Sequence, residues 1–368
     1  MLVRYESSGA LANEIKAAVN AYVDAQDTGR LLRTMLTKTS VILTWSVVSY
    51  AGLVFFATSW WAAFLWSTSL GLAMAGIGMA IQHDANHGAY PGPRWLRRAM
   101  GFLLDLMGGS SYIWKFQHNV NHHSYTNVHD ADADIDIGAF ARLSPAQPHR
   151  AQHKMQHIYL WPMYSLLAVS WVVYADWRDF FSSTIGSNAF PTPKGRERIL
   201  FWAGKAAWAV IWLIIPLSFN TPLAWLPMLL WTYLVLGFTL SVVFQLAHIV
   251  KEAEFLKLEG DPARAERDFF EHQLATTINF ATKNRWLTWY LGGLNFQVEH
   301  HLFPTVPHVY YPALADIVRD ICQKNGVSYH ELPTFRAALA SHTRWLYEMG
   351  RPPQTELDPA SNISAEAA

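Results

Sequence analysis

Two long stretches of the chain, residues 39–82 and 206–247, contain no Asp, Glu, Lys or Arg. A membrane-spanning helix needs about 20 apolar residues, so each stretch is long enough for two spans joined by a tight turn. A buried hairpin of a soluble protein is the alternative, but its helices would carry a polar face. The pattern therefore predicts four spanning helices, at residues 39–58, 61–82, 199–218 and 225–248.

Positive charges lie outside the predicted hairpins. None of the 28 Lys and Arg residues falls in the expected turns at 59–61 and 220–222. Loops rich in Lys and Arg remain in the cytosol, so both turns should face outward. Residues 1–38 carry charge but no apolar run with a cleavage site, which predicts no signal peptide. The expected cytosolic parts are residues 1–38, 83–198 and 249–351.

The rest of the composition narrows the class of protein. Charged residues make up only 15% of the chain and aromatic residues 14%, with no net charge, which gives no reason to expect nucleic-acid binding. A lone cysteine, Cys322, cannot form an intrachain disulfide. Residues 158–175 are apolar but interrupted by Pro162, which favours a helix lying in the membrane interface. The tail at 352–368 is predicted to be disordered.

Half of the 16 histidines fall in four short groups, each at the expected cytosolic end of a span or in a cytosolic segment. Two groups contain an i, i+4 pair, and this spacing puts both imidazoles on one face of a helix. One of them adds a neighbouring histidine, turned by about 100° round the helix and able to reach a second ion. The eight residues are His83, His87, His118, His122, His123, His248, His300 and His301.

Eight histidines are more than one metal site needs. A structural zinc takes four ligands, so the set fits two ions with open positions better than one closed site. Imidazole binds Fe, Cu, Zn and Ni, and the residue type alone does not select among them. A single histidine such as His248 is more often a helix-end residue than a ligand, so the indication comes from the whole set. The lack of Glu-x-x-His pairs argues against a carboxylate-bridged di-iron bundle.

Two other patterns have the spacing of a metal site but lack features that metal binding needs. Three histidines between positions 149 and 157 repeat every four residues, but Arg150 and Lys154 lie among them and oppose metal binding, which favours a surface or helix-face role. Acidic residues alternate between positions 130 and 136, but without the glycine and glutamate of a calcium loop. We expect this loop to cap helices or to hydrogen-bond ligand imidazoles. The residues are His149, His153 and His157, and Asp130, Asp132, Asp134 and Asp136.

Three short sequences resemble the histidine boxes of the membrane fatty-acid desaturases. They are HDANH at 83–87, HNVNHH at 118–123 and QVEHH at 297–301. Gln297 stands in place of the first histidine of the third box. In this feature the chain resembles the front-end and acyl-CoA or acyl-lipid members of the family. The resemblance extends over about residues 35–325. Many front-end members also carry a fused cytochrome b5 domain with a His-Pro-Gly-Gly motif, which this chain lacks.

The resemblance implies an all-α integral membrane protein with four spans and a cytosolic helical cap that holds two iron ions and an acyl tunnel. It implies that the eight histidines are ligands, and that Gln297 contacts the metal directly, through water or not at all. It also implies that O2 is the co-substrate and that electrons come from a separate ferredoxin or cytochrome b5. The acyl substrate would be an acyl-CoA or a membrane lipid, and the host membrane a bacterial inner membrane or the endoplasmic reticulum.

Further residues near the boxes are candidates for supporting roles. Aromatic residues and a glycine could line the tunnel, although core packing explains them more simply. Polar residues inside the boxes could fix imidazole tautomers, and each could equally be a polar residue on the surface of its helix. Cations could meet an acidic donor or acyl carrier, although membrane anchoring explains them more simply. The candidates are Trp114, Tyr112, Gly108 and Phe296 for the tunnel; Asp84, Asn86, Asn119, Asn121, Glu299 and Asn295 for the imidazoles; and Lys115, Arg94, Arg97 and Arg98 for the partner.

Two rival functions use the same residues. A membrane di-iron hydroxylase would leave an oxygen on the carbon where a desaturase removes a second hydrogen, and the ligands do not separate the two. A histidine-rich metal transporter would need ionisable groups deep inside its spans. The predicted spans are free of charge and their clustered histidines lie at one end, which disfavours transport.

Overall fold

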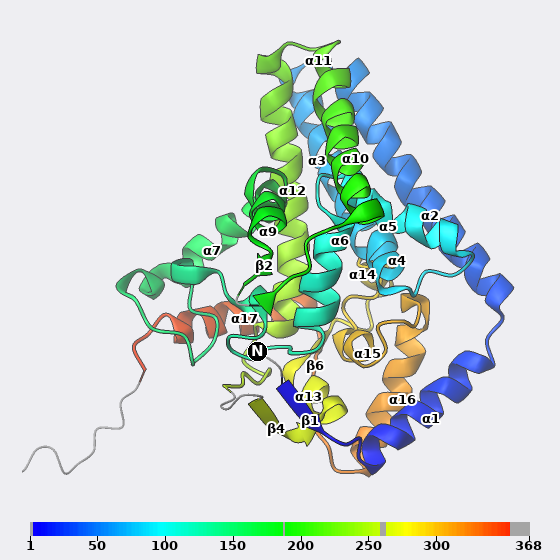
Figure 1. Cartoon of the computed structure of the whole chain (residues 1–368), viewed down its shortest axis with the longest axis vertical. Helices are drawn as coiled ribbons and strands as arrows, with labels where there is room; N and C mark the ends of the chain where they lie inside the picture. The colour runs from blue at the N-terminus through cyan, green and yellow to red at the C-terminus, as the bar shows by residue number, and fades with distance from the viewer. Residues whose placement is uncertain (1–2, 187, 258–262, 354–368) are drawn as a thin grey trace, which may run out of the picture.

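The computed structural model describes residues 3–186, 188–257 and 263–353. A tall stem of helices rises from a broader cap, as Figure 1 shows. Among the described residues, four helices are long and apolar enough to cross a membrane, which confirms the four predicted spans. They are Thr28–Phe56, Trp60–His87, Gly195–Leu217 and Pro222–His248.

Three of the four spans change from α-helix to π-helix along their length. A π-helix bonds residue i to residue i+5 and often marks a functional site. In the second span, the π-helical segment immediately precedes the first histidine box. The segments are α2 (Thr28–Ala51) and η1 (Gly52–Phe56); α3 (Trp60–Ile77), η2 (Gly78–Gln82) and α4 (His83–His87); α10 (Gly195–Ala209), η8 (Val210–Ile214) and α11 (Ile215–Leu217); and α12 (Pro222–His248).

Each of the four spanning helices begins earlier than predicted, at residues 28, 60, 195 and 222 instead of 39, 61, 199 and 225. The Asp27 carboxylate caps α2 by accepting hydrogen bonds from the backbone N–H groups of Gly29 and Arg30, at 2.7 and 3.1 Å. A cap sets where a helix starts, whereas loss of charge sets where the membrane starts, so the two boundaries differ. Ser59 and Thr221 cap α3 and α12 in the same way, and the connections are residues 57–59 and 218–221, where the turns were expected at 59–61 and 220–222.

The segment predicted to lie in the membrane interface is a bent helical pair. Residues Ala151–Tyr164 and Leu166–Ser182 meet at 65°, and together they are apolar enough to count as one broken span. Pro162 lies inside the first part and the helix breaks just beyond it, as expected for a residue without a backbone N–H. The pair comprises η6 (Ala151–Met155), α7 (Gln156–Tyr164), α8 (Leu166–Ser170), η7 (Trp171–Ala175) and α9 (Asp176–Ser182).

Short helices build the rest of the cap below the stem (Figure 1). A separate apolar core joins α1, α15 and α16, and it includes Ile15, Val298 and Leu314. The helices are α1 (Ala10–Asp24), α5 (Arg94–Leu106), α6 (Ser111–Trp114), η3 (Lys115–His122), η4 (Ala133–Ile135), η5 (Gly138–Phe140), α13 (Phe269–Thr276), α14 (Arg285–Tyr290), α15 (Gln297–Leu302), η9 (His308–Tyr310), α16 (Tyr311–Lys324) and α17 (Phe335–Met349).

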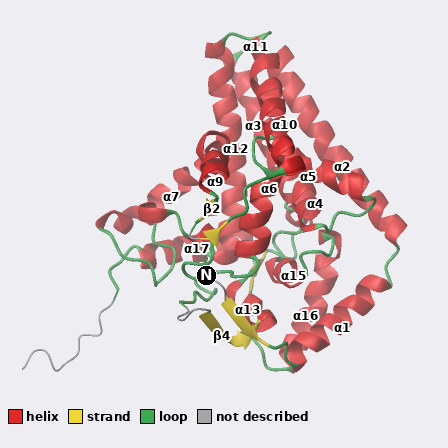
Figure 2. Cartoon of the chain, in the orientation of Figure 1, coloured by secondary structure: helices red, strands yellow, loops and turns green. Residues whose placement is uncertain are grey.

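Strands contribute little to the described fold, as the colouring of Figure 2 makes clear. They form three two-stranded sheets in the cap. Two of these sheets are parallel pairs that join segments distant in sequence. The pairs are β1 (Val3–Glu6) with β4 (Ala263–Asp268), β2 (Thr184–Ile185) with β3 (Asn188–Ala189), and β5 (Asn279–Phe280) with β6 (Glu331–Leu332). Of the tail predicted to be disordered, residues 354–368 lie outside the described residues.

Candidate metal centre

The structure brings all eight predicted histidines into one cluster. They come from α4, from η3 and the residue after it, from the end of α12 and from α15. Within each of three groups, one nitrogen of every ring lies within 4.8 Å of the corresponding nitrogens of the others. The groups are His83, His87, His118 and His300; His122, His248 and His301; and His123, His300 and His301.

A π-helix shapes the second box differently from the α-helix that its spacing suggests. The backbone N–H of His123 donates to the carbonyl of His118, a bond between residues five apart. These residues therefore lie one above the other, and their Nε2 atoms are 3.2 Å apart. The expected turn of about 100° between His122 and His123 rested on α-helical geometry. The ring of His123 also stacks on His301, at 4.1 Å between centroids, so it joins two of the groups.

Polar side chains contact the Nδ1 atom of three of the imidazoles. The Nδ1 atom of His122 donates to Asp132 Oδ2 at 3.0 Å, because a carboxylate can only accept. The Nδ1 atom of His301 donates to Gln273 Oε1 at 2.9 Å, and that of His300 lies 3.1 Å from the Tyr311 hydroxyl. Each contact fixes the ring and leaves its Nε2 atom directed away from the partner.

The opposite nitrogens of these rings have no hydrogen-bond partner among the described residues. Buried polar atoms without partners are rare in proteins, and each calls for an explanation. A neutral imidazole whose other nitrogen is hydrogen-bonded is the form that binds a metal. The donor set therefore fits metal ions. The unpaired atoms in the cluster are Nε2 of His87, His122, His300 and His301, Nδ1 of His123, and both ring nitrogens of His248.

Burial keeps most of the cluster neutral. It lowers the pKa of His118, His123, His300 and His301 well below the ordinary value, and the neighbouring histidines lower it further. His122 differs, because Asp132 and Asp134 outweigh the effect of burial and raise its pKa. The neutral rings keep their lone pairs available, whereas the carboxylates beside His122 supply negative charge on one side of the cluster.

The residues that hold the imidazoles differ from those expected within the boxes. The side chains of Asp84, Asn86 and Glu299 bond elsewhere: to His308, to Gln82 and Gly101, and to Asn279 and Tyr329, respectively. Among the described residues, Asn119, Asn121 and Asn295 likewise make no hydrogen bond from their side chains to the eight rings. None of these six side chains thus bonds a ring of the cluster among the described residues, although Asp84 bonds the ring of His308. The residues that act instead are Asp132, Gln273, Thr126 and Tyr311.

The acidic loop at residues 130–136 caps a helix and bonds an imidazole, as expected. Asp132 caps the short helix η4 by accepting from the backbone N–H of Asp134 at 3.0 Å, while its other oxygen holds His122. The alternating acidic residues were thus the one sequence signal that pointed to an imidazole partner. Gln273 and Thr126 lie in no pattern, and only the fold brings them to His301, at 2.9 and 3.2 Å.

Gln297 is buried at the edge of the cluster. Its Nε2 atom donates to the carbonyl of Leu294 at 2.9 Å, while its Oε1 atom has no hydrogen-bond partner among the described residues. A free amide oxygen at this position is compatible with contact to a metal or to water, which stays a prediction.

The second histidine pattern, at 149–157, is structural. His149 reaches the carbonyl of Gly350 at 3.0 Å, and His153 uses both ring nitrogens in hydrogen bonds to backbone. His157 packs edge-on against the ring of Tyr347. His149 and His153 are thus engaged with backbone groups, and the surface or helix-face role of the pattern stays a prediction.

Of the four tunnel candidates, Trp114 contacts the cluster. Its ring stacks on His118 at 4.4 Å between centroids and lies 5.5 Å from both His83 and His87. Phe296 packs in the core of the cap, whereas Tyr112 donates to the carbonyl of Pro191. Gly108 has φ +96° and closely approaches Val172 and Trp208. Core packing therefore accounts for the last three candidates.

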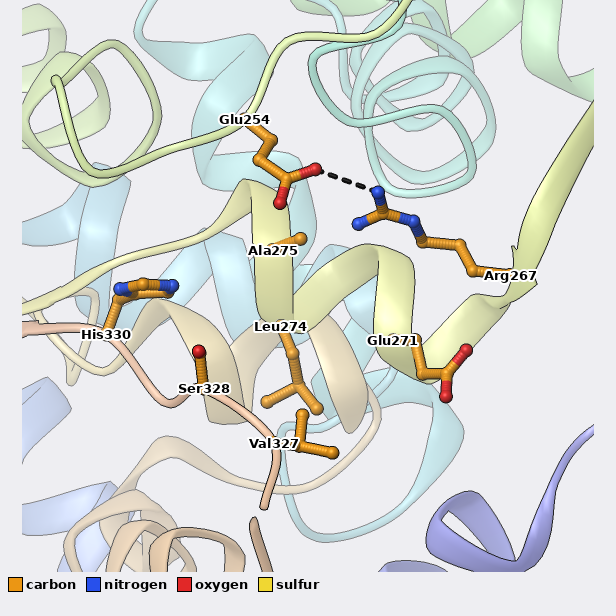
Figure 3. Close-up of a pocket in the computed structure, with 8 residues that line it drawn as sticks. All are labelled: Glu254, Arg267, Glu271, Leu274, Ala275, Val327, Ser328 and His330. Carbon is orange, nitrogen blue, oxygen red and sulfur yellow. Dashed lines mark hydrogen bonds and ion pairs between the residues drawn. The ribbon is translucent and has the colours of Figure 1, made fainter. Parts of the chain in front are cut away.

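A cavity of about 300 Å³ opens on the cap beside α13, and none of the eight histidines lines it. Two of the residues that line it, Arg267 and Glu254, form an ion pair with an N–O distance of 2.9 Å, marked by the dashed line in Figure 3. Leu274 and Ala275 of α13 form one wall, while Gln273 of the same helix holds His301. The cavity thus lies next to the support of the cluster but outside the cluster itself.

The chain is similar to proteins of known activity. Residues 58–333 match the family model described as fatty acid desaturase. The chain is 34% identical over 356 residues to the sn-1 linoleoyl-lipid 6-desaturase of Arthrospira platensis, which covers 96% of each chain. It is 34% identical to the enzyme of the same name from Synechocystis sp., over 86% of this chain and 89% of the relative. It is 35% identical to an acyl-lipid (8-3)-desaturase of Physcomitrium patens, over 79% and 63%.

Fold, cluster and similarity agree on the class of protein: a helical membrane oxidoreductase with a histidine-rich centre. The chain belongs to the fatty acid desaturase family, as the three box sequences predicted. Its reaction is the desaturation of fatty acyl chains.

Proposed function

We propose that the eight clustered histidines bind two iron ions, and that the protein desaturates an acyl chain of a membrane lipid with O2. The single observation that carries this proposal is the set of buried, unpaired imidazole nitrogens that face one another within the cluster. Two ions would satisfy these atoms. Eight nitrogen donors give four to each ion, so an ion that takes five or six ligands would keep positions open for a small molecule.

The chemistry of the reaction favours iron. A methylene C–H bond in an acyl chain has no acidic proton, no carbonyl and no leaving group, so acid–base groups alone cannot attack it. Zinc has no redox chemistry, whereas iron accepts imidazole ligands and changes its oxidation state. When bound, iron would supply the oxidising power by activating dioxygen.

The protein's own residues orient and enclose the centre. Asp132, Gln273 and Tyr311 hold three rings in fixed positions. The ring of Phe244 covers His122 and His248 at 4.9 and 4.8 Å between centroids, and excludes water from that side. An enclosed, apolar site protects a strong oxidant from water and holds the acyl chain at a fixed distance.

The position of the histidine cluster relative to the bilayer supports a lipid substrate. His87 and His248 are the last residues of the second and fourth spans, so the cluster lies where these spans enter the cap. An acyl chain of a membrane lipid would reach this level without leaving the protein–membrane boundary. The relatives named above act on lipid-linked acyl chains, which is consistent with a lipid carrier rather than CoA.

The same arrangement supports a topology. We place the cap, residues 1–38 and the histidine cluster on the cytosolic side, with the bent pair Ala151–Tyr164 and Leu166–Ser182 in the interface. Lys and Arg are concentrated on this side of the spans. Electrons would then come from a separate cytosolic donor, either a ferredoxin or a cytochrome b5.

The proposal is tested by expression in a host of defined lipid composition, followed by mass spectrometry of the extracted lipids. A new double bond, seen as a loss of two hydrogens in a lipid-linked chain, is the expected result. His122→Ala should abolish it, whereas His153→Ala, which removes a buried histidine outside the cluster, should retain it.

Three outcomes would contradict the proposal. A product that gains an oxygen atom would indicate a hydroxylase. Activity retained by His122→Ala would remove that residue from the ligand set. New double bonds confined to acyl-CoA, with none in lipids, would replace the lipid carrier.

A further inference from the structure

A chain of three buried polar residues lies behind the first histidine box. The ammonium of Lys38 is 2.7 Å from His308 Nε2, and His308 Nδ1 is 2.8 Å from Asp84 Oδ2. All three side chains are nearly inaccessible to solvent, at 4, 3 and 2% of their full exposure. They come from α2, η9 and α4, which are far apart in sequence. Burying a charge is costly unless it is paired, so this chain calls for a reason.

Hydrogen-bond chemistry fixes the state of the middle residue. A Lys ammonium can only donate, so His308 Nε2 accepts, and the proton of the ring is on Nδ1. That proton is donated to Asp84, whose carboxylate can only accept. A neutral imidazole thus connects a buried cation to a buried anion, and the three groups together carry no net charge. Because both ring nitrogens are engaged, His308 is not available as a metal ligand.

Asp84 lies inside the first box, between His83 and His87 on α4. Its Oδ2 atom accepts two bonds from His308, one from the ring and one from the backbone N–H at 3.3 Å. The next helix on from His308 contains Tyr311, whose hydroxyl contacts His300. The segment 308–311 therefore binds both box 1, through Asp84, and box 3, through His300.

These two boxes supply three of the four histidines in one group of the cluster, and the fourth is His118 of the second box. The ring of His300 lies 4.6 Å from His83 and 4.9 Å from His87 between centroids. His83 and His87 have no contact of their own with a carboxylate among the described residues, unlike His122, which Asp132 holds directly. Their position depends on α4, and α4 is fixed to the segment after box 3 through Asp84.

We propose that Lys38, His308 and Asp84 are positioning residues that hold His83 and His87 against His300, and so set the metal affinity of this group. The inference rests on the proposed metal centre. Residues that orient a ligand indirectly typically change metal affinity by about 10- to 100-fold. Asp84 and His308 act on the backbone of the box, and Lys38 holds the His308 ring from its other nitrogen.

A buried ion pair could instead serve stability alone, and the chain contains a matched control for that case. Lys205 donates to Asp176 Oδ2 at 2.6 Å, with both side chains buried. This pair joins α10 to α9 and also reaches the carbonyl of Gly108. It contacts none of the eight histidines among the described residues.

The experiment measures Co(II) and Fe(II) binding to the purified full-length protein in detergent, without oxygen, against a competing chelator. Asp84→Asn and Lys38→Met should each weaken binding of the metal by about tenfold or more. They should also change the visible spectrum of the Co(II) protein. Asp176→Asn and Lys205→Met should lower the unfolding temperature but leave metal affinity within about twofold of the wild type.

The results separate this proposal from the proposed function. A wild-type protein that binds no metal at the cluster would refute the proposed function itself. Wild-type-like affinity and spectra in both Asp84→Asn and Lys38→Met would refute the positioning role alone. Should Asp84→Asn not fold, Lys38→Arg decides: it keeps a donor to His308, so its affinity should exceed that of Lys38→Met, and equal affinities would overturn the proposal.

Discussion

The two sides of the histidine cluster are built differently. His122, His248 and His301 are at most 1% exposed, and polar side chains hold two of them directly. On the other side, the ring of Trp114, which is partly exposed, lies beside His83 and His87. His83 and His87 are positioned by helix α4, without a side chain that holds their rings as Asp132 holds His122. In the proposed two-iron centre, the position at His122, His248 and His301 would be the enclosed one and would have a carboxylate partner.

The enclosed side should be the more sensitive to loss of its support. Asp132 accepts from His122 Nδ1 and from the backbone N–H of Asn127, at 3.0 and 2.9 Å. Asp132→Ala removes both bonds and leaves two buried donors unpaired. We expect desaturation to fall by about 100-fold, with loss of bound metal. Lipid analysis and metal content measure the two effects; full activity with full metal content would show that the carboxylate is dispensable.

Gln273 supports the same side with a neutral group. Its amide oxygen accepts from His301, and its Nε2 donates to the carbonyl of His123 at 3.0 Å. Gln273→Leu keeps the approximate size but removes both bonds, and activity should fall by about tenfold. Gln273→Glu keeps an acceptor for His301 and should be less impaired. An order reversed between the two variants would contradict this role of the amide.

On the side of His83 and His87, a substitution beside the rings should change how the substrate is positioned and leave metal binding unchanged. Trp114→Leu removes a ring that covers His83, His87 and His118 but is bonded to none of them. We expect a decrease of a few-fold in activity or a change in double-bond position, with bound metal unchanged. A loss of metal as large as that in Asp132→Ala would show that the two sides are equivalent.

A separate prediction concerns the pH dependence of stability. Burial lowers the pKa of His342 to about 4, and its ring bonds the carbonyl of Ile249 and the hydroxyl of Tyr164. A lowered pKa gives stability that is present above pH 6.5 and is lost as the pH falls towards 4, by about 3 kcal/mol in total. His342→Gln should flatten this dependence in thermal unfolding between pH 7 and 4. An unchanged pH dependence would assign the effect to other groups.

The sequence predicted the parts of the molecule that depend on composition and spacing. Residues 39–82 and 206–247 could span a membrane because they lack charge, and the structure places helices there. The eight histidines could be grouped because their spacing is visible in the chain. Their convergence was expected only because His83, His122 and the others lie at the same end of the spans.

The sequence did not reveal the contacts that depend on tertiary packing. Gln273 reaches His301 from a helix with no motif, and Lys38 reaches His308 across 270 positions of the chain. The π-helical geometry of Lys115–His122 also has no signature in residue spacing, because it is set by packing. Polar residues inside the boxes were attractive candidates for imidazole partners, yet Asp84 holds His308, a histidine outside the eight.

The most direct measurement is the iron content of the active protein, purified from membranes and assayed for desaturation in the same preparation. Two iron ions per chain, falling in parallel with activity when a chelator removes them and in His122→Ala, is the expected result. An active preparation without stoichiometric iron would contradict the account.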